Sequence, residues 1–88
     1  MRRICDEYQD IVDTERLAAS IKYGAFKSTH EGLGVLTEEY TELVEAIHRN
    51  DMDSIVHEAL QVAAVAIRLA CSLDDPGVRQ RSNVQNVA

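Results

Sequence analysis

The strongest constraint in this sequence is a segment from Met52 to Leu73 that is apolar, at helical spacing, around most of its circumference. A helix of this kind must be covered on several sides. An 88-residue chain has room for few other helices, so we expect a second subunit to supply part of the cover. The polar strip of this helix is narrow and consists of Ser54, His57, Gln61 and Arg68.

Two further helical segments precede the apolar one. Residues 5–23 carry apolar side chains at near-helical spacing and stop at Gly24, a common residue just beyond a helix end. Ser28 and Glu31 have the spacing of a capping box, so a second helix should begin there and run to about Arg49. The sequence therefore predicts an all-α fold, a three-helix subunit that forms an intertwined helical bundle on dimerisation.

The chain is short enough for one domain, which we place at residues 1–75. Asp51 or Asp53 should cap the third helix. The run Asp74-Asp75-Pro76-Gly77 should end it. Residues 76–88 show no clear periodicity, and we expect a tail that is flexible or contacts a neighbouring subunit.

Charge and composition exclude several classes of protein. With 15 acidic and 9 basic residues the formal charge is −6, which disfavours nucleic acid as a partner. No run approaches the ~18 apolar residues of a membrane span, so we expect no membrane partner. Cys5 and Cys71 have no metal-ligand spacing. Free thiols without an apolar signal sequence point to a cytoplasmic protein.

Two carboxylates do not fit a simple solvated helix face. On a helical wheel Glu39 falls at the edge of the apolar stripe of the second helix. Glu58 is less usual still, because its neighbours on the wheel are Val62, Val65 and Leu69. A carboxylate among apolar side chains is costly unless a cation or hydrogen bonds compensate its charge.

The spacing of these acids suggests a metal site. Glu39 and Glu42 are three residues apart, and Glu58 and Gln61 repeat that spacing on the next helix. Two antiparallel helices would bring both pairs together as an oxygen-rich cage, which favours Mg²⁺ or Mn²⁺ over zinc. The alternative is that Glu39 and Glu58 form structural ion pairs with Lys22, Lys27 or Arg68. Spacing alone leaves both interpretations open.

The same residues resemble a known family. Glu38-Glu39-Tyr40-Thr41-Glu42 has the form EExxE. Fifteen residues separate Glu42 from Glu58-Ala59-Leu60-Gln61, which stands where an ExxD motif is expected. This arrangement resembles the MazG-like, all-α nucleoside triphosphate pyrophosphohydrolases, in the short single-domain form of phages and mobile elements. The likeness extends from about Lys22 to Leu69. It implies a homodimer or homotetramer that hydrolyses the α–β bond of a nucleoside triphosphate, releasing a monophosphate and pyrophosphate.

The resemblance also implies roles for individual residues. Glu39, Glu42 and Glu58 would be Mg²⁺ ligands, with Mn²⁺ as a possible substitute. Gln61 stands where the family commonly has Asp, so it would offer an amide oxygen without charge. Glu38 and Glu42 would orient the site or take a proton from water. The candidates for substrate contacts are Lys22, Phe26, Lys27, His30 and Arg68. Each of these also has a structural alternative, as a solvated, capping or core residue.

Two functions from different classes follow. The first is a Mg²⁺-dependent hydrolase that converts a nucleoside triphosphate, canonical or modified, to the monophosphate and pyrophosphate. The second is a non-catalytic helical dimerisation or regulatory module that retains a degenerate metal site. Gln61 favours the second function, whereas Glu58 speaks against it, because a packing module gains little from a carboxylate at that position.

Overall fold

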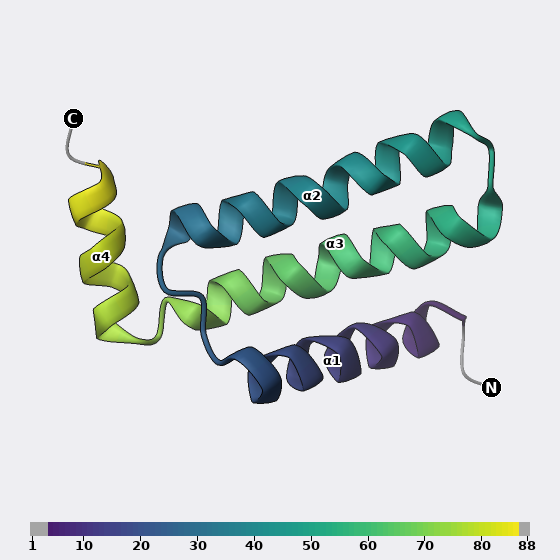
Figure 1. Ribbon diagram of the computed structural model, residues 1–88. Helices are drawn as coiled ribbons and strands as arrows, with labels where there is room; N and C mark the ends of the chain where they lie inside the picture. The colour runs from purple at the N-terminus through teal and green to yellow at the C-terminus, as the bar shows by residue number, and fades with distance from the viewer. Residues whose placement is uncertain (1–3, 87–88) are drawn as a thin grey trace.

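The computed structural model describes residues 4–86, and this range contains four helices and no strands. The helices are α1 (Ile4–Tyr23), α2 (Thr29–His48), α3 (Met52–Ser72) and α4 (Pro76–Asn86). The helices α2 and α3 form an antiparallel hairpin, α1 lies along the other side of α3, and α4 lies across the end where α2 begins (Figure 1). The all-α prediction is confirmed, but the described residues form a fourth helix, α4, in addition to the three that were expected.

Local sequence signals explain where α1 ends and α2 begins. Gly24 has φ +73°, a conformation that glycine adopts without the steric cost of a side chain. The side chain of Ser28 accepts a hydrogen bond from the backbone N–H of Glu31 at 3.2 Å, as the capping box predicts. The carboxylate of Glu31 in turn accepts from the backbone N–H of Lys27 at 3.1 Å. The turn between the two helices is therefore held from both sides.

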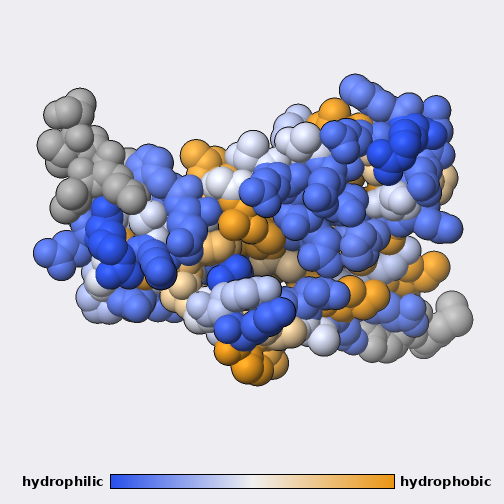
Figure 2. Space-filling view, viewed as in Figure 1, coloured by the Kyte–Doolittle hydropathy of each residue, from blue (hydrophilic) through white to orange (hydrophobic). Residues whose placement is uncertain are grey.

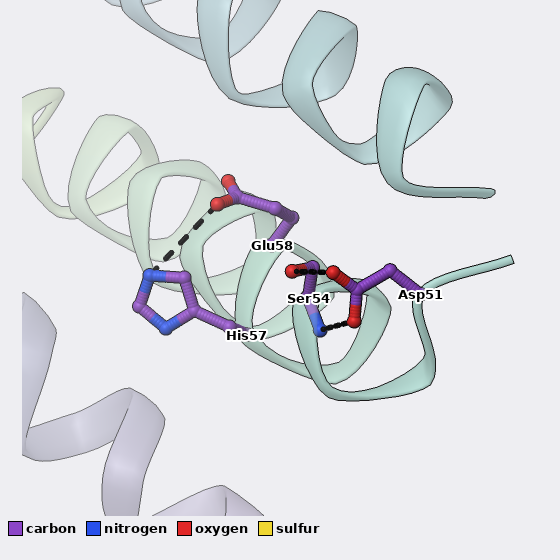
Figure 3. A network of polar contacts seen from close by, with 4 residues as sticks. All are labelled: Asp51, Ser54, His57 and Glu58. Atoms are coloured by element: carbon purple, nitrogen blue, oxygen red, sulfur yellow. Dashed lines mark hydrogen bonds and ion pairs between the residues drawn. The ribbon is translucent and has the colours of Figure 1, made fainter. Parts of the chain in front are cut away.

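Asp51, rather than Asp53, caps α3. Its carboxylate accepts hydrogen bonds from the backbone N–H of Ser54 at 3.2 Å and from the Ser54 hydroxyl at 2.7 Å (Figure 3). These bonds favour the ionised carboxylate and lower the pKa of Asp51. Asn50, with φ 56°, completes the tight turn from α2.

The helix α4 replaces the expected tail. The carboxylate of Asp75 accepts from the backbone N–H of Gly77 at 2.8 Å, and Pro76 occupies the first helical position, where no N–H is needed. Asp75 and Pro76 therefore start α4, a few residues after α3 has ended at Ser72.

Three side chains attach α4 to the rest of the same chain. Val78 is fully buried. One turn later the Ser82 hydroxyl accepts from the backbone N–H of Thr29 at 2.9 Å, at the first residue of α2. Arg81 donates to the carbonyl of Lys27 in the preceding loop. The region expected to be flexible or to reach a neighbour thus packs on its own subunit.

The core is small and is centred on α3. Gly32 allows α2 and α3 to approach closely, because a Cβ atom at this position would lie 2.5 Å from Cδ1 of Leu69. The buried apolar residues are Val12, Phe26, Ala46, Ala64 and Val78. Several of them are small, so burial within one copy of the chain leaves much apolar surface uncovered.

The exposed surface is unusually large for a chain of this mass. The chain exposes 6280 Å², whereas a folded monomer of 9.8 kDa is expected to expose about 5,200 Å². Apolar side chains reach the surface between polar ones (Figure 2). By length and composition alone α3 is apolar enough to cross a membrane, so the expectation that no segment approaches a membrane span is wrong. The core helix of a soluble protein passes the same test, although only 11% of this segment is buried here. The large exposed apolar residues are Ile4, Ile11, Leu17, Ile21, Tyr23, Leu33, Tyr40, Ile47, Met52, Val56 and Ile67.

Candidate metal centre

Three carboxylates meet where α2 and α3 face each other. One oxygen from each of Glu39, Glu42 and Glu58 lies within 4.8 Å of the other two. Glu39 and Glu42 come from one side of α2, three residues apart, and Glu58 comes from α3, which runs in the opposite direction. The sequence-based prediction that these three side chains come together is confirmed.

Glu58 is the most enclosed of the three. Its side chain is 17% exposed, and its Oε2 atom is buried without a hydrogen-bond partner. Its Oε1 atom lies 3.8 Å from Nε2 of His57, whose side chain is 66% exposed and points outward from α3 (Figure 3). Ionised carboxylates only accept hydrogen bonds, so Glu39 and Glu42 in their charged forms supply no donor to this oxygen. The cluster therefore has an unsatisfied buried acceptor at its centre.

Two carboxylates of the cluster, Glu39 and Glu42, are harder to ionise than an ordinary glutamate. The pKa of Glu39 is raised first by partial burial and then by the negative charges of Glu42 and Glu58. The pKa of Glu42 is raised first because its carboxyl group is within hydrogen-bonding reach of Glu58, and then by the charge of Glu58. A positive ion among the three oxygens would relieve both the repulsion and the unsatisfied acceptor.

The oxygen positions are compatible with a hard divalent cation. Oxygens bound to one Mg²⁺ at about 2.1 Å are at most about 4.2 Å apart. The observed limit of 4.8 Å is slightly wider, so small side-chain rotations would close the three oxygens around an ion. Carboxylate oxygens without nitrogen or sulfur donors are the ligand set of Mg²⁺ or Mn²⁺.

The structural ion pairs proposed as the alternative are not present. Within residues 4–82, whose side chains are described, neither Glu39 nor Glu58 is paired with a lysine or arginine. Arg68 donates instead to the backbone carbonyl of Gly24, at 3.1 Å from Nη2. The Lys22 ammonium lies 5.1 Å from the centre of the Tyr23 ring.

Gln61, expected as the fourth ligand, lies elsewhere. It lines a small cavity of about 70 Å³ between α1 and α3, together with Glu15, Arg16 and Arg68. The structure brings together three of the four expected ligands and places the amide on the α1 side of α3.

Glu38 lies on the outer face of α2. It lines an open groove of about 420 Å³ with Glu42 and Glu45, and all three are exposed. Glu42 therefore belongs both to this groove and to the carboxylate cluster, whereas Glu38 is beside the cluster without forming part of it.

Most of the expected substrate-contact residues gather around the loop between α1 and α2. A groove of about 370 Å³ opens there, and its walls are Tyr23, Ala25, Phe26, Lys27, Glu31, Val35 and Arg68. Phe26 is almost completely buried and serves the core as well as the groove. His30 is exposed and is not among the lining residues, and Lys22 lies next to the groove at Tyr23.

Glu31 is the groove residue that the helical wheel did not reveal. The wheel places it on the outer, solvated side of α2, and its capping role explained its presence. Its position in the groove depends on how the preceding loop folds back over the start of α2. A periodic pattern in the sequence does not predict the path of a loop. No family model, curated protein or solved structure matches this chain.

Proposed function

We propose that the protein is a Mg²⁺-dependent nucleotide pyrophosphohydrolase, which cleaves the α–β bond of a nucleoside triphosphate to a monophosphate and pyrophosphate. The observation that carries this proposal is the cluster of Glu39, Glu42 and Glu58, with its buried and unsatisfied oxygen. The EExxE motif and the glutamate of the second motif supply these three side chains, which is why the resemblance and the geometry point to the same residues.

The charge of the chain supports a metal-bridged substrate. A protein with a formal charge of −6 repels a triphosphate, so cations must neutralise both partners for them to associate. Glu39, Glu42 and Glu58 would hold Mg²⁺ or Mn²⁺. When bound, the ion supplies Lewis-acid polarisation of the phosphate and lowers the pKa of a coordinated water.

Glu42 is the best-placed proton acceptor. It is exposed to solvent and lies at the edge of the cluster, so a water molecule beside a bound ion can reach it. Glu38, one turn earlier in the same outer groove, is positioned to orient a water molecule beside it. Gln61 has no part in this assignment, because it faces α1.

We further propose that the working form is a homodimer or homotetramer. The chain exposes about 1,000 Å² more than expected for its mass, close to the ~800 Å² that each partner buries in a standard interface. An apolar groove of about 290 Å³ on α2 and α3 is a suitable contact for a second copy; it is lined by Leu33, Leu36, Thr37, Tyr40 and Val62. Light scattering coupled to size-exclusion chromatography should give a mass at least twice 9.8 kDa.

The test of the catalytic proposal is a substrate panel. Purified protein is incubated with each common NTP and dNTP, in Mg²⁺ or in chelator, and pyrophosphate and monophosphate are measured separately. We expect Mg²⁺-dependent release of pyrophosphate that is lost in Glu58→Gln and retained in Asp13→Asn. Asp13 is an exposed carboxylate on α1 away from the cluster, so its variant controls for the change in charge.

The same panel distinguishes the hydrolase from the alternative function, a non-catalytic module. A non-catalytic dimerisation or regulatory module would release no pyrophosphate from any nucleotide, and Mg²⁺ would not raise its melting temperature. Mg²⁺-dependent stabilisation without turnover of common nucleotides would instead point to a modified nucleotide as the substrate.

A further inference from the structure

Arg68 is a buried cation that forms no ion pair with a carboxylate of the described part of the chain. Its side chain extends from α3 to the loop after α1 and is 8% exposed. Nε and Nη2 both donate to the carbonyl of Gly24, at 3.4 and 3.1 Å. A guanidinium has five N–H donors, so this one carbonyl leaves three of them without an acceptor among the residues that the structure describes. A charge buried at this depth is costly unless further acceptors reach it.

Arg68 borders more than one hollow of the surface, among them the groove at the start of α2 and the small cavity that it shares with Glu15 and Gln61. Arg68 is one of the residues that line this groove, and its guanidinium carbon lies 3.9 Å from the centre of the Phe26 ring. The ring of Tyr23 is 5.7 Å from the same atom and is part of a side chain that is 65% exposed. The groove therefore combines an arginine held in place by Gly24 and Phe26 with an exposed aromatic residue, Tyr23, whose ring the Lys22 ammonium also approaches to 5.1 Å.

A carboxylate lies in the same groove. Glu31 is exposed, and one of its oxygens is held by the backbone N–H of Lys27. Ala25 and Val35 supply apolar wall between the charged groups. A ligand that fits this set is planar, stacks on an aromatic ring, and carries both acceptors and donors on its edge. Nucleobases have these properties and are recognised in this way by aromatic, arginine and acidic side chains.

Two residues of the groove and one residue of the carboxylate cluster lie along the same face of α2. Glu31, Val35 and Glu39 follow at intervals of four residues and so share one face of the helix. Eight residues of helix span about 12 Å, which is the scale of the separation between the base and the phosphates of a nucleotide. Base and triphosphate could therefore occupy the two sites at the same time.

We propose that the groove around Arg68, Tyr23 and Glu31 is the subsite for the base of the nucleotide, and that it prefers bases with a ring carbonyl. Arg68 donates to the carbonyl oxygen, Glu31 accepts from a base N–H, and the base stacks on Tyr23. Adenine has no carbonyl and presents an amino group instead, so it matches Arg68 poorly. This inference rests on the proposed function, because it assigns the other end of the same substrate.

The test uses nucleosides, which have no phosphate and need no metal. Inosine and adenosine differ at purine position 6, where inosine has a carbonyl and adenosine an amino group. Each is titrated into ¹⁵N-labelled protein in chelator and followed by two-dimensional NMR. We expect inosine to shift the amide signals of residues 23–27 and the Arg68 Nε–H signal, with a Kd at least about fivefold below that of adenosine.

Variants identify the contacts. Tyr23→Ala should raise the Kd for inosine about fivefold or more, because stacking on an aromatic ring is lost. Ile21→Ala, an exposed apolar truncation two residues earlier on α1, should leave it unchanged. Glu58→Gln should also leave nucleoside binding unchanged, so a failure of catalysis and a failure of this inference can be told apart. The comparison of the two nucleosides requires no change at the buried Arg68.

Three outcomes would overturn the inference. The first is equal binding of inosine and adenosine, or no shift of the groove signals with either nucleoside. The second is inosine binding that Tyr23→Ala does not weaken. The third is displacement of inosine by inorganic phosphate that shifts the same signals, since this would make Arg68 an anion site. Pyrophosphate release without nucleoside binding would leave the catalytic proposal standing and remove the base subsite.

Discussion

The Nε2 atom of His57 lies 3.8 Å from Oε1 of Glu58, whereas Oε2 of Glu58 is buried and has no hydrogen-bond partner among the described residues. The histidine is largely exposed, so solvent screens its charge. The buried Oε2 atom of Glu58 is thus available to a cation that binds between α2 and α3. A buried carboxylate oxygen without a partner is expected of a residue that binds a cation, and is not expected of a residue in a structural ion pair.

Replacing Glu58 by Gln should stabilise the metal-free protein and abolish its response to Mg²⁺. The change removes a repelling charge and supplies N–H donors to Glu39 and Glu42. In chelator we expect the melting temperature to rise by a few degrees, since about 1 kcal/mol corresponds to roughly 4–8 °C in a domain of this size. Addition of Mg²⁺ should raise the melting temperature of the wild type and of Asp13→Asn, but not that of Glu58→Gln. A lower melting temperature for Glu58→Gln, with and without Mg²⁺, would mean that Glu58 has a structural role.

The raised pKa of Glu39 predicts an unusual dependence of stability on pH. Because the folded-state pKa lies above the ordinary value of 4.5, the folded protein binds more protons than the unfolded chain between these two values. The contribution of Glu39 to stability is therefore complete below pH 4.5 and is lost as the pH rises through the folded-state pKa. Melting temperatures of the wild type and Glu39→Gln, compared in chelator over this range, should show the wild type losing stability relative to the variant. A relative gain with rising pH would contradict the prediction.

The position of Gln61 predicts that Gln61→Asp changes Mg²⁺ affinity by less than twofold. The new carboxylate would face the cavity with Arg16 and Arg68 rather than the three glutamates. Glu39→Gln, which removes a carboxylate of the cluster itself, should weaken Mg²⁺ binding at least about tenfold, because one charge-assisted ligand is lost. Isothermal titration with Mg²⁺ measures both affinities. Tighter binding by Gln61→Asp would place residue 61 at the ion.

Two glycines of α2 should respond in opposite directions to alanine. At Gly34 no atom lies within 4 Å of the added Cβ, so Gly34→Ala should stabilise the protein by about 0.5–1 kcal/mol through helix propensity alone. At Gly32 the added Cβ would lie 2.5 Å from Leu69 Cδ1 and 3.3 Å from Phe26 Cδ2. Gly32→Ala should therefore cost about 1–3 kcal/mol through overpacking. Urea unfolding measures both free energies, and a stabilised Gly32→Ala would show that α2 and α3 are less closely packed.

The sequence alone determined the three long helices and most of the cluster. Helical periodicity and caps such as Ser28 are local properties, so they can be identified without knowing what packs against each helix. The conflict between Glu58 and its apolar neighbours was also visible on the helical wheel, because burial of a charge is costly in any fold. A three-residue spacing on α2 was enough to place Glu39 beside Glu42.

Only the tertiary structure determined where α4, Gln61 and Arg68 lie and which residues they contact. The helix α4 has no apolar stripe, and it is held by Val78 and Ser82, which find their partners where the chain folds back to the start of α2. Gln61 and Glu58 share a helix, but the rotation of α3 between its two neighbours directs the amide toward α1. Arg68 meets the carbonyl of Gly24, 44 residues earlier in the chain. These outcomes depend on contacts between distant segments, and a local pattern carries no information about which segments meet.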